Sequence, residues 1–326
     1  MSEKVSVLAQ TTLKGVRSVI RSRDGLMESC CLSEPNEIPT ACGPLIPRWG
    51  QEDERSRARP SLSFYPDGSL RSIYLQDRTT VKTPIGSYPA ELLIFYPEGQ
   101  LQRLFPLNGQ LSGFWELNDE QRLCPELNFH LFCGSFKTKI IGLHFYASGA
   151  LRSLTFWPDE TVVLRTNVGL MPVRHGAAFY EDGRLESLEP GEPLLVSTPL
   201  GNLTAYDSHS LGLQGDRNSL AFNSDGSMRS IVTSTDQVQV IKAGHEVMSF
   251  RPLLKPDPLQ ESRLTILPLR VNFSQTQVTF NNGEQQGRYD LADCCFRTAA
   301  GSADFHEILQ QPPLSCGDCG SCHLCG

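Results

Sequence analysis

The sequence lacks a surplus of positive charge and lacks any long hydrophobic run. Its 29 Lys and Arg residues against 36 Asp and Glu residues give a formal net charge of −7. An acidic chain has no electrostatic attraction to a phosphate backbone, so we do not expect nucleic acid as a partner. The first 22 residues lack the apolar core of a secretory signal, and no uncharged stretch is long enough to span a bilayer. We therefore expect a cytoplasmic protein without a transmembrane segment.

The short motifs that mark common catalytic sites are also missing. No glycine-rich loop runs into Gly-Lys-Ser/Thr, and there is no dinucleotide fingerprint, no serine nucleophile elbow and no His-Glu-x-x-His pair. The seven histidines are scattered singly, which is typical of surface or packing positions. Helical periodicity is absent between Gly25 and Gly244, so we expect strands there. These absences favour a non-catalytic, all-β protein.

What the sequence does have is a turn that recurs along the chain. The segment Phe64–Leu75, FYPDGSLRSIYL, places Pro-Asp-Gly between two β-prone runs, and these three residues favour a tight hairpin. Related copies read RSRDGLM, FYPEGQL, FYASGAL, FYEDGRL and FNSDGSM, with their glycines at Gly25, Gly99, Gly149, Gly183 and Gly226.

A second motif follows most of these turns. It reads TACG, TPIG, TNVG, TPLG or IKAG and ends at Gly43, Gly86, Gly169, Gly201 or Gly244. The two glycines are 18 residues apart in four units and 20 apart in the fifth. Internal repetition on this scale indicates a solenoid, a propeller or an extended array. The unit at Gly99 lacks the second motif.

Each unit is predicted to hold about three short strands. Val81, Thr83 and Ile85 alternate with polar residues or proline before the second glycine, which predicts a half-buried strand that pairs on one side. After the first glycine, apolar residues lie two and five positions on, as at Leu70 and Ile73. An odd separation means either that both faces of this strand are covered, which we favour, or that a bulge intervenes.

The fold predicted from these patterns is a curved open meander of antiparallel hairpins, each sheltering its apolar face on its neighbours. A closed six-bladed β-propeller is the alternative, although the uneven distances between turns disfavour it. The turn motif resembles the bacterial variant of the MORN (membrane occupation and recognition nexus) repeat, with its YxxDGxL hairpins. That resemblance implies a family used mostly for binding and assembly, and it carries over no catalytic residues.

Three parts of the chain are expected. Residues 1–250 form the hairpin array, with an insertion at about 106–133; residues 251–311 form a β-rich C-terminal segment; residues 312–326 form a cysteine-rich tail. The insertion reads NGQLSGFWELNDE, and its candidate binding residues are Trp115, Glu116, Asp119 and Glu120. The alternative is a cap or a longer hairpin that packs the tryptophan on the sheet.

The tail holds four cysteines at a spacing of three, namely Cys316, Cys319, Cys322 and Cys325. Pairs spaced C-x2-C can bring two thiolates to one metal, and the run C-x2-C-x2-C resembles bacterial ferredoxins. Zinc ribbons separate their two C-x2-C-G knuckles by about 15–20 residues, whereas only Ser321 lies between the knuckles here, so an iron–sulfur cluster is favoured slightly over zinc. The ferredoxin pattern continues with three residues and then Cys-Pro, and this chain departs from it.

Two other interpretations of the tail stay open: a dithiol redox or metal-relay segment, and a disordered end that binds nothing. Among the remaining cysteines, Cys30, Cys31 and Cys42 are expected to pack in the core, and the vicinal pair Cys294 and Cys295 is more typical of packing than of ligation.

The functional hypothesis is a scaffold that binds a protein partner and holds a metal or an iron–sulfur cluster on its tail. The rival hypothesis is a redox enzyme, or an electron- or thiol-transfer protein, that uses the same four cysteines.

Overall fold

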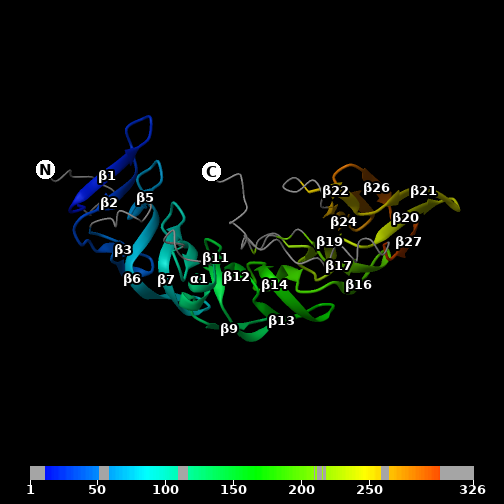
Figure 1. Cartoon of the computed structure of the whole chain (residues 1–326), viewed down its shortest axis with the longest axis horizontal. Coiled ribbons are helices and arrows are strands. Elements are labelled where there is room, and N and C mark those ends of the chain that lie inside the picture. Colours follow the sequence, from blue (N-terminus) through cyan, green and yellow to red (C-terminus); the bar gives the residue numbers. More distant parts are fainter. Residues whose placement is uncertain are drawn as a thin grey trace, which may run out of the picture. The chain divides into compact units, whose positions relative to one another are not determined.

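The computed structural model in Figure 1 shows a chain built almost wholly of strands. Strands hold 61% of the residues and helix 2%, so the predicted all-β class is confirmed. The described residues are 12–50, 59–108, 117–208, 210, 215, 218–257 and 264–301.

The first half of the chain contains fifteen strands and one helix among its described residues. They are β1 (Val16–Arg21), β2 (Met27–Leu32), β3 (Ile38–Thr40), β4 (Gly43–Leu45), β5 (Leu62–Phe64), β6 (Leu70–Thr83), β7 (Gly86–Phe95), β8 (Leu101–Phe105), α1 (Leu117–Leu123), β9 (Leu127–Leu131), β10 (Gly134–Thr138), β11 (Ile140–Phe145), β12 (Leu151–Phe156), β13 (Thr161–Thr166), β14 (Gly169–Phe179) and β15 (Leu185–Pro190).

The second half contributes twelve more strands among the residues described there. They are β16 (Leu194–Thr198), β17 (Gly201–Ala205), β18 (Leu220–Phe222), β19 (Met228–Thr233), β20 (Gln237–Lys242), β21 (His245–Phe250), β22 (Leu253–Pro256), β23 (Leu264–Leu267), β24 (Leu269–Phe273), β25 (Gln277–Asn281), β26 (Gln286–Asp290) and β27 (Cys295–Ala299).

One large sheet carries most of these strands. Its order is β1-β2-β5-β6-β7-β8-β11-β12-β14-β15-β18-β19-β24-β25-β26, and β13 pairs with β14 beside this path. Strand order follows chain order, as in a meander. Over the described ranges, β1 and β26 do not pair with each other, so the sheet is open. The open meander is confirmed, and the closed propeller is not what the chain forms.

The six predicted turns adopt one hydrogen-bonding geometry. In the second turn, Gly68 N–H donates to Tyr65 O and Tyr65 N–H donates to Ser69 O, both at 2.9 Å. The other five turns repeat the pair of bonds at 2.8–3.0 Å. Gly68 has φ +84°, the left-handed conformation that glycine adopts without steric cost. The Pro-Asp-Gly pattern therefore encodes a hairpin with a glycine bulge, which we call a glycine turn.

The strands after the first five glycine turns carry a further bulge. Phe64 pairs with Leu70 while Ser63 pairs with Ser72, so Arg71 is an extra residue in the ladder. The bulge brings Leu70 and Ile73 onto the same, buried face, even though their separation is odd. The small residue Ser72 is buried on the other face. We expected covered faces in place of a bulge. The structure has both, because the strand is bulged and is buried on both faces.

The second motif closes a second type of turn. Thr83 Oγ1 donates to Gly86 O at 2.8 Å, and the threonines of the other TxxG copies do the same at 2.6–2.8 Å. The recurring three-residue spacing of Thr and Gly therefore places the threonine hydroxyl within hydrogen-bond distance of the glycine carbonyl. We call these four segments, residues 40–43, 83–86, 166–169 and 198–201, the tip turns. Of the described strands that lead into them, β3, β13 and β16 each pair with one neighbour.

The chain divides into two compact units. The first comprises Met1–Glu192, Leu211–Asn218 and Phe222–Ser227, and the second comprises Pro193–Ser210, Ser219–Ala221 and Met228–Gly326. The first unit buries the phenylalanine that precedes each of its later glycine turns: Phe64, Phe95, Phe145, Phe179 and Phe222.

The second unit has its own aromatic core and a buried polar turn. Phe250 stacks on Phe280 with ring centroids 4.6 Å apart. The buried carboxylate of Asp236 accepts hydrogen bonds from Thr204 N–H and Thr235 Oγ1, so its burial is compensated.

The helix α1 was not predicted. It has seven residues, with Asp119 and Glu120 in its first turn and Arg122 in its last, which suits the helix dipole. A helix of two turns is too short to produce a periodic pattern in the sequence. In the described part of the chain no helix is long and apolar enough to cross a membrane.

Candidate functional site

The predicted tail site lies outside the described residues. This holds for Cys316, Cys319, Cys322 and Cys325, and equally for Trp115 and Glu116 of the insertion. Of the predicted site residues, Asp119 and Glu120 are described, and both lie on α1.

The two described acids of the insertion have different surroundings. Asp119 Oδ1 is 3.4 Å from Arg122 Nη1, an exposed pair within the helix. Glu120 is half-buried, and burial raises the pKa of its carboxyl, with Arg59 opposing the shift and Glu91 adding to it. The structure therefore brings Glu120 to a set of charged residues that includes Arg59 and Glu91.

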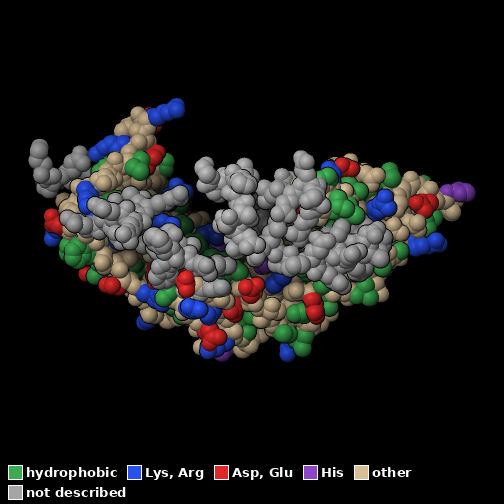
Figure 2. All heavy atoms as spheres, viewed as in Figure 1, with side chains coloured by type: hydrophobic (Ala, Val, Ile, Leu, Met, Phe, Trp, Pro, Cys, Tyr) green, Lys and Arg blue, Asp and Glu red, His purple; other side chains and the backbone are tan. Residues whose placement is uncertain are grey.

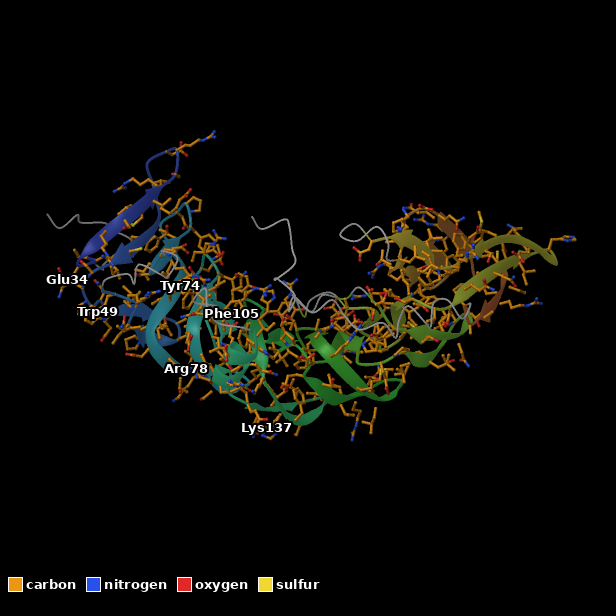
Figure 3. All side chains as sticks on the ribbon, viewed as in Figure 1. Glu34, Trp49, Tyr74, Arg78, Phe105 and Lys137 are labelled. Carbon is orange, nitrogen blue, oxygen red and sulfur yellow. The ribbon has the colours of Figure 1, made fainter. Side chains whose placement is uncertain are left out.

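This charged set holds the backbone at the start of the insertion. Glu91 on β7 accepts from Arg78 Nε at 3.0 Å and Nη2 at 2.7 Å, and also from Asn108 N–H at 3.1 Å. Arg59 Nη1 donates to Asn108 O at 2.7 Å. Arg78 is labelled in Figure 3. The Asn108 N–H thus binds a carboxylate, and the Asn108 C=O binds a guanidinium. These two charged hydrogen bonds position the chain after β8.

This arrangement is an electrostatic clamp on the backbone of Asn108. The Glu91 carboxylate is saturated by three donors, and Glu120 lies one helical turn before Cys124, whose N–H donates to Glu120 O at 3.1 Å. A buried thiol, Cys124, lies beyond it and donates to Ile140 O at 3.5 Å, and burial raises its pKa. A protonated buried thiol is inert.

The other described cysteines follow the packing prediction for the most part. Cys30 and Cys31 are buried, and burial raises the pKa of Cys30 to about 12. Cys42 is half-buried, whereas in the vicinal pair Cys294 is buried and Cys295 is exposed. Where the chain is described, no group of three or more His, Cys, Asp or Glu residues could hold a metal ion.

The row of glycine turns carries the most regular polar feature of the first unit. Tyr65 Oη donates to Phe95 O at 2.8 Å, and Phe95 precedes the next turn. The same bond joins Tyr96 to Phe145, Tyr146 to Phe179 and Tyr180 to Phe222, at 2.8–2.9 Å. We call these four bonds the tyrosine ladder. Each hydroxyl ties one turn to the strand end of the following turn, so the row is fixed by its own side chains.

Acidic side chains close the turns from within. Asp67 Oδ1 accepts from Ser69 Oγ at 2.6 Å and from Ser69 N–H at 2.9 Å, and these bonds hold the pKa of Asp67 below its ordinary value. Asp182 and Asp225 accept from the backbone two residues on in the same way, and their pKa values are also lowered. These carboxylates serve the turn and are not available as acids or bases.

Two of the tip turns cover glycine turns further along the row. A Cβ built on Gly149 would lie 3.2 Å from Pro84 Cγ, so the proline ring packs against this glycine. Asn167 Nδ2 donates to Gly226 O at 3.1 Å. A covered glycine turn thus receives a side chain from the second position of a tip turn.

A groove remains open at the third glycine turn. Its volume is about 640 Å³, which is within the range of ligand sites, and it lies between residues of the first tip turn and of the third glycine turn. A second, smaller hollow of about 200 Å³ surrounds Asn167 and Gly226.

Surface charge does not single out a nucleic-acid or membrane face in the part that can be seen. On the face drawn in Figure 2, the coloured Lys and Arg side chains alternate with Asp and Glu, and no area of one sign gathers.

The tyrosines of the ladder are part of the turn motif, but no role was predicted for them from the sequence. The available signal was the tyrosine after each phenylalanine in four consecutive copies, replaced by Ser22 in the first and Asn223 in the last. Comparison of the chain with family models, with curated proteins and with solved structures gave no match.

Proposed function

We propose that this protein is a non-catalytic scaffold that binds a protein partner on its row of turns and holds a metal ion or an iron–sulfur cluster on its tail cysteines. The observation that supports the binding role is the tyrosine ladder. It fixes consecutive turns to one another, and a rigid row of turns is a surface that binds without a large loss of conformational entropy.

The described residues lend no support to the enzymatic rival. The charged set around Glu91 is saturated by hydrogen bonds, and the described Cys30, Cys124 and Cys133 are buried thiols with raised pKa values. The resemblance of the turns to MORN-type hairpins, a family of binding and assembly modules, also favours a scaffold.

The tail supplies the metal half of the proposal. Four cysteines at a spacing of three in eleven residues can provide a full set of thiolate ligands. We expect Cys316, Cys319, Cys322 and Cys325 to bind iron and sulfide in preference to zinc.

Anaerobic purification followed by iron, acid-labile sulfide and zinc analysis tests the metal half. The expected result is metal in stoichiometric amount, which is lost when the four tail cysteines are replaced by serine. Replacement of Cys30 and Cys31 by serine is the matched control and should leave the metal content unchanged. Absence of all three analytes from the unaltered chain would contradict this half.

Photo-crosslinking tests the binding half independently. A photoreactive residue at the exposed position Glu181, within the fifth glycine turn, should give one discrete protein adduct in cells. The same residue at Lys242, on β20 of the second unit, should not give that adduct. Equal labelling from both positions would argue against binding on the row of turns.

A further inference from the structure

We infer that the groove at the third glycine turn, residues 96–99, is a binding site for a proline-containing segment of a protein partner with a basic residue next to the proline. This inference rests on the proposed scaffold function and names its site and the chemistry of its partner. The groove is lined by Pro39, Thr40, Ala41, Ser69, Leu70, Phe95, Pro97, Glu98, Gly99 and Gln100.

The contacts between tip turns and glycine turns follow one rule. The tip turn of the second unit supplies Pro84 to the fourth glycine, Gly149. The tip turn of the fourth unit supplies Asn167 to the sixth glycine, Gly226. A tip turn therefore covers the glycine turn two units further along the chain.

The rule also explains the uncovered glycines. A Cβ built on Gly25, Gly68 or Gly183 would meet nothing within 4 Å. No unit lies two before the first or the second turn, and the third unit, which lies two before Gly183, has no tip turn. The rule therefore provides no described tip turn to cover these three glycines.

Gly99 is the exception. The first unit has a tip turn, and the rule directs it to the third glycine turn, where it does line the groove. Yet a Cβ built on Gly99 would also meet nothing within 4 Å. The second position of this tip turn is Ala41, where the covering turns have Pro84 and Asn167. Among the described residues, no side chain fills this space.

The two filled positions show what the empty one accepts. A proline ring packs on Gly149, and a carboxamide bonds to the backbone of Gly226. At Gly99 the apolar lining comes from Pro39, Leu70, Phe95 and Pro97, which suits the ring and not the amide. An aromatic and proline-rich lining is also how extended proline segments are bound in general.

Glu98 supplies the negative charge of the groove. The equivalent acids, Asp67, Asp182 and Asp225, accept hydrogen bonds from their own turns. Glu98 is one methylene longer, and its carboxylate has no hydrogen-bond or ion-pair partner among the described residues. It is exposed, and it is the one charged group of the lining. A lysine or arginine beside the bound proline would pair with it.

The probe is an acetylated, amidated octapeptide with two Lys-Pro pairs, titrated against the full chain by fluorescence anisotropy. Binding with Kd below about 1 mM is expected, as is usual for short linear segments. The peptide with alanine in place of both prolines, and the peptide with glutamate in place of both lysines, should bind at least tenfold more weakly. No binding below 1 mM, or equal binding of the alanine peptide, would overturn the inference.

The chain provides its own blocking variant. Ala41→Pro recreates the Thr-Pro-x-Gly tip turn found at residues 83–86 and 198–201, so it should fold, and its ring should fill the groove. We expect at least a tenfold loss of peptide binding with no loss of thermal stability. Ala41→Asn copies the tip turn at residues 166–169 and serves in the same way if the proline variant does not fold.

A matched pair of acid variants tests the charge. Glu98→Gln should weaken binding about two- to fivefold, an effect that added salt reduces, because the ion pair is exposed. Glu192→Gln, an exposed acid that follows β15 and lies outside the glycine turns, should leave binding unchanged. Unaltered binding by Ala41→Pro, or equal effects of the two acid variants, would overturn the site. Either of these results would leave the crosslink at position 181 and the metal content unaffected. Those two measurements test the proposed function separately.

Discussion

At the residue scale, the tyrosine hydroxyls are the groups that connect one turn to the next. Serine is too short to reach the following strand end, and asparagine occupies the last turn, which has no further glycine turn to bind. Tyrosine therefore stands in the four turns that bond to the strand end of a following turn, whereas the first turn has Ser22 at this position. Phenylalanine at these positions would keep the packing but remove the bond.

Tyr146→Phe should lower the free energy of unfolding by about 1 kcal/mol, because the Phe179 carbonyl loses its hydroxyl donor. Chemical denaturation at neutral pH measures the change. Tyr74→Phe is the control, since the Tyr74 hydroxyl has no partner among the described residues and the side chain, labelled in Figure 3, is also half-buried. Equal losses in the two variants would show that the ladder bonds contribute nothing.

His175 makes stability depend on pH. Its backbone is left-handed with φ 62°, and burial, helped by Arg174, lowers its pKa from 6.5 to about 4. The folded chain therefore binds fewer protons than the unfolded chain between these two values, so stability falls as the pH drops from 6.5 to about 4. For a half-buried ring we expect a loss of about 1–2 kcal/mol across this window.

His175→Asn tests this, because asparagine tolerates the left-handed conformation but does not titrate. Its unfolding free energy should lose this part of the pH dependence, while the variant with Asn in place of the exposed His245 keeps it. A pH profile unchanged by His175→Asn would show that the histidine is not responsible.

At the element scale, the turns differ in what surrounds their glycines. Gly183 and Gly226 have φ +84° and +86°, and both would be strained by a side chain. A Cβ on Gly183 would meet open space, whereas on Gly226 it would lie 2.2 Å from Asn167 Nδ2.

Gly183→Ala should therefore cost about 1 kcal/mol from backbone strain alone. Gly226→Ala should cost about 2 kcal/mol, because it also displaces the Asn167 amide from the Gly226 carbonyl. Adding Asn167→Ala to Gly226→Ala should then cost little more. Additive losses in the double variant would mean that the tip turn does not contact the glycine turn in solution.

Most of the element scale could be predicted from the sequence, because its determinants are local. Pro66, Asp67 and Gly68 fix a turn within four residues, and Thr83 and Gly86 fix another. The helix α1 was missed because two turns leave no periodic signal. The contact of Asn167 with Gly226 was missed because these residues are 59 positions apart, and a hydrogen bond between them depends on the register of the whole row.

The candidate sites were predicted less well than the fold, for a related reason. Asp119 and Glu120 were singled out together, but Asp119 pairs with Arg122 of its own helix, whereas Glu120 is half-buried near Arg59 and Glu91. The groove at Gly99 could not be predicted, because its cause is a missing side chain, Ala41, opposite a turn almost sixty residues away. The tail cysteines remain a prediction from spacing alone.

At the scale of the whole molecule, the large sheet is open and is built of hairpins. Most of these hairpins contact their neighbours along the chain. Stability in such an array is a sum of hairpin terms and of terms between adjacent hairpins. A defect in one ladder bond should then be felt by the two turns that it joins and only weakly by distant ones.

Amide hydrogen exchange of the Tyr146→Phe variant, compared with the unaltered chain, tests this claim most directly. Faster exchange is expected in the turns at residues 145–150 and 179–184, with protection at residues 62–75 unchanged. Equal acceleration throughout the first unit, or no acceleration at residues 179–184, would contradict the ladder as the device that joins one hairpin to the next.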